Sequence, residues 1–315
     1  MEKRILGNTG LEVTELCFGA LPMGPLQKDL TVEQSAKIIE RALLKGVNFI
    51  DTAEMYKTYE PIAMAMKNTG VRPIIASKSN KKTYEGMEAA VNEALSMLNI
   101  DYIDIFHLHA AREGVNVFEL FADALNCLID MKKQGKVKHI GISTHSAAVA
   151  HIAADHPSID VVFPIINMQG LGILDGTKEE MITGIKKLHA AGKGVYLMKV
   201  LAGGGLIGNY HEAMQYARDI KDYSSIAVGM TSLAEVDYNV AYFSGQEVGA
   251  LPADNVNEKK AIVSLNLCKG CGKCIPACPN KAIAFKDKKA NIDKNICLTC
   301  GYCTPVCPEF AIRVV

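Results

Sequence analysis

The chain lacks tryptophan, and aromatic residues make up only 6% of its 315 positions. It also lacks net charge, because 34 Lys and Arg residues balance 34 Asp and Glu residues. No basic stripe with interleaved aromatic residues is present, which argues against a nucleic-acid partner. No apolar run approaches the ~20 residues that a membrane-spanning helix requires, so we expect no membrane span.

A secretory signal is missing as well, since the opening stretch MEKRILGNTG becomes polar after a few apolar residues. What the chain does have is cysteine, and eight of its ten cysteines lie between Cys268 and Cys307. Closely spaced thiols are typical of metal sites in a reducing compartment rather than of a disulfide framework. We therefore expect a cytoplasmic protein. The two other cysteines, Cys17 and Cys127, lie in apolar patterns that are typical of a core.

Short apolar segments alternate with helical patterns along the first 245 residues. They cover residues 16–20, 47–51, 72–78, 102–109, 137–143, 160–166, 194–200 and 225–230. Buried parallel strands have this pattern, and eight such units predict an α/β fold with a (β/α)8 TIM barrel. A doubly wound sheet is the alternative, although no GxGxxG motif follows the first strand.

Local signals predict further elements and the domain boundaries. The expected elements are a hairpin over residues 4–13 and helices over 31–45, 83–98 and 117–134. Thr31 and Gln34 form a capping-box pair at the start of the first helix. The expected domains are a barrel over residues 1–250, a linker over 251–262 and a small domain over 263–315.

The small domain contains an internal repeat with an offset of 29 residues. Its first four cysteines, Cys268, Cys271, Cys274 and Cys278, recur as Cys297, Cys300, Cys303 and Cys307. Each set has the spacing C-x2-C-x2-C-x3-C-P, and the region resembles the α+β bacterial ferredoxins with two [4Fe–4S] clusters. In such runs the fourth cysteine serves the other cluster. The expected ligand sets are Cys268, Cys271, Cys274 and Cys307 for one cluster, and Cys278, Cys297, Cys300 and Cys303 for the other. Two four-cysteine zinc sites are the alternative, and clusters that only stabilise a small domain are another.

Reactive side chains follow several of the predicted strands. Asp51, Lys78 and His109 end three strands, and Tyr56 comes five residues after Asp51. Barrel chemistry gathers at the C-terminal ends of strands. A tyrosine can protonate a carbonyl that receives hydride, and a neighbouring ammonium would lower the pKa of the phenol. Taken singly, each residue also has an ordinary structural interpretation, such as a helix cap for Asp51 or a core histidine for His109.

Taken together, residues 4–245 resemble the aldo-keto reductase family. The resemblance rests on the N-terminal hairpin, the DTAxxY motif, the Lys and His at strand ends, and the GIS motif. It implies a small-molecule substrate and the catalytic set Asp51, Tyr56, Lys78 and His109, with Tyr56 as the proton donor. His107, two residues before His109, is expected to be a hydrogen-bonded core residue.

The cofactor positions depart from the family. Ser143 and a later asparagine, Asn167, are retained, but Thr144, Phe163 and Met198 replace the Asn, Gln and stacking aromatic that usually contact nicotinamide. Gly229 and Glu235 stand where family members that prefer NADP have a Lys and Arg clamp, so NADP(H) is disfavoured. The other positions expected to bind the cofactor are Gly19, Lys199, Gly203, Gly204, Gly205 and Thr231. The glycines and Thr231 would offer backbone N–H groups to a phosphate.

A [4Fe–4S] cluster exchanges one electron, whereas a hydride contains two. A flavin can exchange electrons singly or in pairs, which favours FMN in the barrel, with NAD(H) as the alternative. We expect an oxidoreductase that couples carbonyl or alcohol chemistry to the clusters and to a redox protein partner. The alternative functions are an electron-transfer protein whose barrel is a non-catalytic scaffold, and a zinc-bearing regulatory protein.

Overall fold

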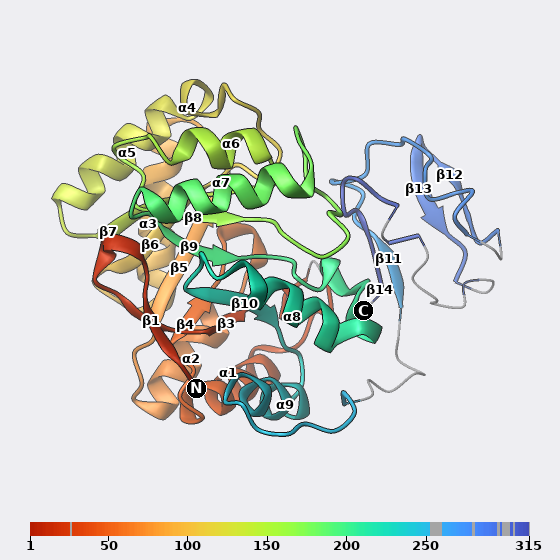
Figure 1. Ribbon diagram of the computed structural model, residues 1–315, viewed down its shortest axis with the longest axis horizontal. Coiled ribbons are helices and arrows are strands. Elements are labelled where there is room, and N and C mark those ends of the chain that lie inside the picture. The colour runs from red at the N-terminus through yellow and green to blue at the C-terminus, as the bar shows by residue number, and fades with distance from the viewer. Residues whose placement is uncertain are drawn as a thin grey trace.

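The computed structural model describes residues 1–25, 27–252, 260–278, 281–294, 297, 303–304 and 306–314. Its larger part is a closed barrel of parallel strands, with helices around the outside (Figure 1). The strands are β3 (Leu16–Gly19), β4 (Phe49–Asp51), β5 (Ile74–Ser79), β6 (Ile103–His109), β7 (Val137–Thr144), β8 (Val161–Pro164), β9 (Gly194–Leu197) and β10 (Ser225–Gly229). β10 pairs with β3 and closes the barrel, with Ile226 opposite Leu16. The barrel prediction is confirmed, and the doubly wound sheet is excluded.

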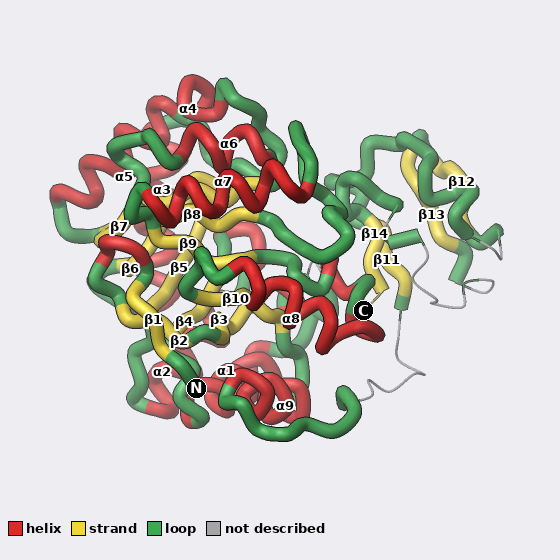
Figure 2. The backbone as a smooth tube through the Cα atoms, viewed as in Figure 1, coloured by secondary structure: helices red, strands yellow, loops and turns green. Residues whose placement is uncertain are grey.

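The helices surround the outer face of the barrel (Figure 2), and the residues that they bury are mostly apolar. They are α1 (Val32–Leu44), α2 (Tyr59–Thr69), α3 (Tyr84–Leu98), α4 (Val117–Leu120), α5 (Ala122–Lys133), α6 (Ala147–Ala153), α7 (Lys178–Ala190), α8 (Tyr210–Ile220) and α9 (Leu233–Phe243). Thr31 and Gln34 form the predicted capping box of α1. The helix predicted over 117–134 is interrupted at Phe121, whose φ of −109° and ψ of 17° leave the helical region.

The N-terminal hairpin lies outside the barrel, as predicted. It consists of β1 (Lys3–Ile5) and β2 (Glu12–Thr14), joined through a 3-10 turn at Gly7–Thr9. The turn packs against the loop before β9, where Asn8 N donates to Gly192 O over 2.8 Å. Gly7 has a φ of +53°, and a Cβ there would overlap the backbone of that loop, so the close approach requires glycine.

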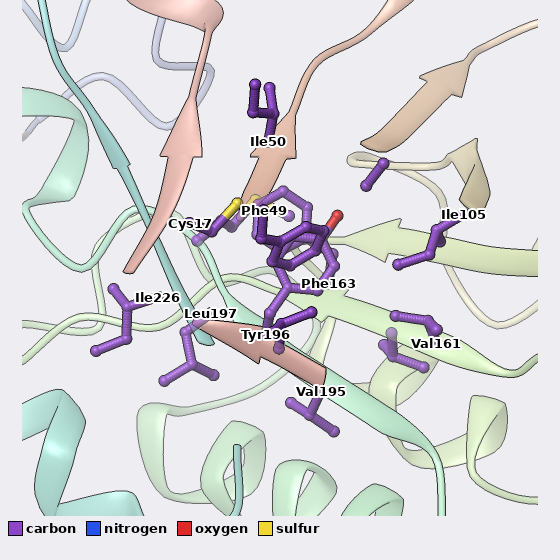
Figure 3. Close-up of a cluster of buried hydrophobic side chains, with 14 of the residues drawn as sticks. Cys17, Phe49, Ile50, Ile105, Val161, Phe163, Val195, Tyr196, Leu197 and Ile226 are labelled. Carbon is purple, nitrogen blue, oxygen red and sulfur yellow. The ribbon is translucent and has the colours of Figure 1, made fainter. Parts of the chain in front are cut away.

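The interior of the barrel is filled by large side chains rather than by a channel. Figure 3 shows Cys17, Phe49, Phe163 and Tyr196 gathered there from four different strands. The rings of Phe163 and Tyr196 are stacked with their centroids 3.9 Å apart, and Phe49 contacts Tyr196 edge-on at 5.0 Å. These aromatic rings fill the barrel below the C-terminal ends of the strands. The candidate site lies at those ends. Cys17 and Cys127 are both fully buried, as expected.

The small C-terminal domain has two short antiparallel sheets. One pairs β11 (Ala261–Val263) with β14 (Ile312–Val314), and the other pairs β12 (Ile283–Lys286) with β13 (Lys289–Ile292). β14 packs against the short 3-10 turn that follows β9, and Figure 1 shows the β11–β14 sheet between the barrel and the β12–β13 hairpin. The linker predicted over residues 251–262 lies mostly outside the described residues, and the domain boundaries remain a prediction. Within the described chain, every helix is too short or too polar to cross a bilayer.

Candidate active site

A buried ion pair lies at the centre of the site. Asp51 ends β4 and Lys78 lies near the end of the neighbouring strand β5. Lys78 Nζ donates to both carboxylate oxygens of Asp51, over 2.6 and 2.7 Å, and to Thr52 O over 2.8 Å. Both side chains are almost fully buried. Burial opposes the charge on Lys78, but Asp51 and Tyr56 hold its pKa above the ordinary value, so the ammonium stays charged.

Tyr56 lies next to this pair, in a 3-10 turn after β4. Lys78 Nζ is 4.9 Å from the centroid of the Tyr56 ring, and the His109 ring meets Tyr56 edge-on at 6.2 Å. Burial raises the pKa of Tyr56, and this effect exceeds the opposing effect of the Lys78 ammonium. The expected net lowering of the phenol pKa is therefore not found. The lowering contribution of Lys78 is present, but desolvation outweighs it.

The two histidines of β6 have different surroundings. Burial, helped by Lys78 and Lys199, lowers the pKa of His109 to about 3, so its imidazole is neutral. His107 is fully buried, and its Nε2 lies 2.8 Å from the hydroxyl of Tyr196. Since Tyr196 donates its one proton to Asp51 Oδ2 over 2.9 Å, His107 Nε2 must donate to Tyr196. His107 is thus the bonded core histidine that the sequence predicts.

Tyr196 is the site residue that the sequence analysis missed. It links His107 to Asp51 by hydrogen bonds and fixes the orientation of the carboxylate that pairs with Lys78. The signal in the sequence was a tyrosine within the otherwise apolar segment that contains β9. A buried tyrosine usually finds a hydrogen-bond partner. Which partner it would find depended on the closure of the barrel.

A cavity of about 210 Å³ opens above Tyr56 and Asp51. Seven positions expected to bind a cofactor line it, namely Gly19, Met198, Lys199, Gly203, Gly204, Gly229 and Thr231. Phe163 and Glu235 also contribute to its wall. Lys78 and His109 are not among the lining residues and lie beside Tyr56. The C-terminal domain completes the wall with Arg313 and Val314.

Ser143, Asn167 and Gly205 do not line the cavity, in contrast to the expectation. The Asn167 amide donates to Leu171 O and accepts from Leu171 N, both over 2.9 Å, and so closes its own turn. Ser143 is fully buried, and its hydroxyl lies 3.5 Å from Leu108 O. These three residues shape the backbone around the cavity but do not face it.

Two of the backbone N–H groups that were expected to bind a phosphate already donate hydrogen bonds within the protein. Gly204 N donates to Leu201 O over 2.8 Å. Thr231 N donates to Glu235 Oε2 over 2.6 Å, and the Thr231 hydroxyl contacts the same oxygen at 3.2 Å. A carboxylate thus occupies the position at the start of α9 where a phosphate was expected. The expectation that these N–H groups are free is wrong for Gly204 and Thr231.

A second, smaller cavity of about 10 Å³ lies in the C-terminal domain. Its lining includes Cys268, Cys271, Cys274 and Cys307, the four ligands expected for one cluster. Backbone N–H groups of Ala290 and Ala311 donate to the sulfurs of Cys268 and Cys307, over 3.4 and 3.3 Å. Such N–H···S bonds are typical of iron–sulfur sites, where they tune the cluster potential. The residues present therefore fit a [4Fe–4S] cluster.

For the other predicted ligand set, Cys278 accepts from Ala282 N over 3.3 Å, and Cys300 lies outside the described residues. Among the described residues, no three Cys, His, Asp or Glu side chains converge as ligands of a single ion.

The C-terminal domain is joined to the barrel beside the main cavity. Arg112 pairs with Glu309, with Nη1 and Oε2 2.6 Å apart, and donates from Nη2 to Glu309 O over 2.8 Å. Phe310 contacts the His145 ring edge-on at 5.7 Å and lies 4.1 Å from Lys199 Nζ. Arg313 lines the main cavity together with Tyr56. A side chain of the C-terminal domain therefore shares the cavity with the candidate catalytic tyrosine.

Comparisons with known proteins agree with this architecture. Over 307 residues the chain is 25% identical to L-galactose dehydrogenase of Arabidopsis thaliana, covering 84% of this chain and 94% of that protein. An aldo-keto reductase structure from Pseudomonas aeruginosa matches with a TM-score of 0.67 at 21% identity, covering 77% of this chain and 95% of that one. The Bombyx mori aldo-keto reductase in complex with NADP matches with a TM-score of 0.58 at 16% identity, covering 78% and 88%.

Two family models account for most of the sequence. The model of the aldo/keto reductase family matches residues 15–240, which include all eight barrel strands. The model of the 4Fe-4S dicluster domain matches residues 267–311. The chain belongs to the aldo/keto reductase family and bears a 4Fe–4S dicluster domain in addition to its barrel.

Proposed function

We propose that the barrel interconverts a carbonyl and an alcohol group on a small molecule and that the clusters exchange the electrons one at a time. The observation that supports this most is the buried grouping of Asp51, Tyr56, Lys78 and His109 beneath the main cavity. The residues come from three strand ends, where catalytic groups of barrels are found. Their types match an acid–base site for hydride chemistry.

In this proposal Tyr56 gives its proton to the carbonyl oxygen during reduction and recovers it during oxidation. Its raised pKa keeps the phenol protonated between turnovers. When the phenolate forms, the Lys78 ammonium stabilises it, and Asp51 and Thr52 hold that ammonium in place. The neutral His109 orients the substrate oxygen by a hydrogen bond. A cofactor in the cavity supplies the hydride chemistry when it is bound.

The proposed electron path runs through both domains. Converting one carbonyl to an alcohol takes up two electrons and two protons, and each cluster passes one electron at a time. A one-electron redox protein would supply or accept these electrons at the C-terminal domain. The cluster expected on Cys307 is the one that we propose to exchange electrons with the barrel, since Glu309 and Phe310, which follow Cys307, contact Arg112 and Lys199 of the barrel.

Two cofactors remain candidates for the barrel, each with an observation in its favour. Glu235 lines the cavity at the start of α9, where a carboxylate can accept a hydrogen bond from a ribose 2′-hydroxyl and repels a 2′-phosphate. This favours NAD(H) over the NADP bound to the Bombyx mori protein. The one-electron clusters favour FMN, because a flavin can exchange electrons singly or in pairs.

Anaerobically purified protein distinguishes the two cofactors. Denaturation should release FMN, identified by its fluorescence, or NAD(H), identified by chromatography, together with about eight irons per chain if both clusters are present. Neither cofactor in the released fraction, combined with no binding of either on addition, would refute the proposed barrel chemistry.

A second experiment separates an enzyme from an electron carrier with a scaffold barrel. Tyr56→Phe should lower turnover on a panel of carbonyls and alcohols by about 10²–10⁴-fold, because the proton donor is lost. Reduction of the clusters by a chemical reductant should not change. Tyr102→Phe, which alters an exposed tyrosine, is the matched control. Unchanged turnover in Tyr56→Phe, or electron transfer to a partner with no substrate found for the wild type, would favour the carrier.

A further inference from the structure

A residue of the cluster domain forms part of the barrel cavity. Arg313 lies on β14, where side chains alternate between two faces. Its neighbour Ile312 is buried in the core of the cluster domain, and Arg313 points the other way, into the wall of the main cavity. Its Nη1 atom is 3.6 Å from the position that a Cβ on Gly203 would take, so the guanidinium lies against the loop after β9.

Two other cations, Lys28 and Lys199, line the same cavity. The Nζ of Lys199 lies 4.1 Å from the centroid of the Phe310 ring, and its backbone has a φ of +57°, which is unusual for a residue with a side chain. Such a conformation is unfavourable for a residue with a Cβ and persists only where surrounding contacts enforce it. The loop therefore holds this ammonium at the cavity despite the strain.

Within the described part of the chain, neither cation has a carboxylate partner. Salt bridges include neither Lys199 nor Arg313, and the two acids of the cavity wall are engaged elsewhere. Asp51 binds Lys78 and Tyr196, and Glu235 accepts from Thr231. Burial and the repulsion of Arg313 lower the pKa of Lys199. Two cations that lie together and are partly desolvated are unfavourable unless an anion joins them.

We propose that Arg313 and Lys199 together bind an oxyanion of the substrate, a carboxylate next to the carbon that reacts. The proposal rests on the proposed function, because Tyr56 lines the same cavity as both cations and an anion held there would lie next to the reacting group. The substrate class is then a 2-oxo or 2-hydroxy acid. A guanidinium suits this role, since its planar fork binds a carboxylate through two parallel hydrogen bonds.

This assignment makes the cluster domain part of the substrate site. Arg313 determines specificity for the barrel only when β14 is docked against it, so the barrel alone would lack half of its anion site. Two other roles compete for the same cations. They could bind the phosphate of the barrel cofactor, or Arg313 could only neutralise the cluster near Cys307.

The test measures binding without turnover. Lactate and lactamide have similar shapes and differ in charge, and their binding to the anaerobic full-length chain can be compared by ligand-observed NMR at low ionic strength. The variants are Arg313→Gln, Arg313→Lys and Lys199→Met. The matched control is Lys286→Met, which removes one positive charge from an exposed position of the same domain. Iron content and bound cofactor are measured for each protein.

The wild type and Lys286→Met should bind lactate at least tenfold more tightly than lactamide. Arg313→Gln and Lys199→Met should lose that preference with full iron content, and Arg313→Lys should keep part of it. Equal binding of the two probes to the wild type, or no binding of either, overturns the proposal. An unchanged preference for lactate over lactamide in Arg313→Gln also overturns the proposal. This holds whether the variant loses its cofactor or only has a shifted cluster potential. Failure here leaves the Tyr56→Phe experiment intact, since that experiment measures turnover and not anion binding.

Discussion

The buried pair of Asp51 and Lys78 allows a quantitative test of the site. Asp51→Asn keeps the shape of the side chain but leaves the Lys78 ammonium without a carboxylate, in a place where it is almost fully buried. Removing one partner of a buried pair costs about 3–5 kcal/mol. At about 2–4 °C per kcal/mol for a domain of this size, the melting temperature of the barrel should fall by roughly 6–20 °C.

The assay is anaerobic thermal unfolding followed by far-UV circular dichroism, on Asp51→Asn, Lys78→Met and the double variant. The double variant removes both charges, and it should be more stable than either single variant, with an interaction energy of at least about 1.5 kcal/mol. The pair Arg41–Asp237 on the outer helices is the control, since its partners are about 46% and 40% exposed. Asp237→Asn should cost less than about 1 kcal/mol.

Two outcomes would refute the reasoning. If the melting temperature of Asp51→Asn falls no further than that of Asp237→Asn, water or another group must compensate the charge of the Lys78 ammonium. If the double variant is destabilised by the sum of the two single effects, the two charges do not act as a pair. In either case the account of how Lys78 is held charged beside Tyr56 would fail.

Two further predictions concern pH and docking. Burial lowers the pKa of His109 to about 3, so the unfolded state binds this proton more tightly than the folded state does. The contribution of His109 to the free energy of unfolding should therefore be fully present above pH 6.5 and should decline as pH falls toward 3. Between pH 7 and pH 5 this contributes about 2 kcal/mol in urea unfolding, and His109→Asn should reduce that decline. A Cβ on Gly172, which has a φ of +81°, would overlap the Phe310 ring, so Gly172→Ala should loosen the C-terminal domain. Proteolysis between the domains should become faster with iron content unchanged, and Gly208→Ala, which meets nothing within 4 Å, should behave like the wild type. An unchanged cleavage rate in Gly172→Ala would contradict the docking geometry.

Much of the fold could be predicted because its signals are local. Each apolar segment in the first 245 residues became one barrel strand, since a buried parallel strand needs continuous apolar sequence. The capping box at Thr31 needs only residues three positions apart, and it formed as predicted. The break at Phe121 was missed, because the helical periodicity of the sequence continues across it. Only the dihedral angles of this one residue depart from helical values.

The candidate site could be predicted in part for a related reason. Strand ends meet at one edge of a barrel, so Asp51, Lys78 and His109 could be expected to lie near one another. The expectation of free N–H groups was wrong for Gly204 and Thr231, because residue propensity does not reveal which N–H groups are engaged. Glu235 lies four residues after Thr231, and only the way α9 begins brings its carboxylate back to Thr231 N.

The sequence alone determined which reactive groups this chain has and where they lie along it. The spacing of the cysteines predicts cluster ligands, because it reflects how far neighbouring thiols can reach. The residues at strand ends can be identified from the apolar pattern of single segments, so neither prediction needs coordinates. The tertiary structure decided how the two chemistries meet. It joined Tyr196 to Asp51 by a hydrogen bond and brought Arg313 of the last strand into the wall of the cavity that Tyr56 also lines. Contacts between residues so far apart in the chain arise from barrel closure and domain packing, to which no local pattern contributes.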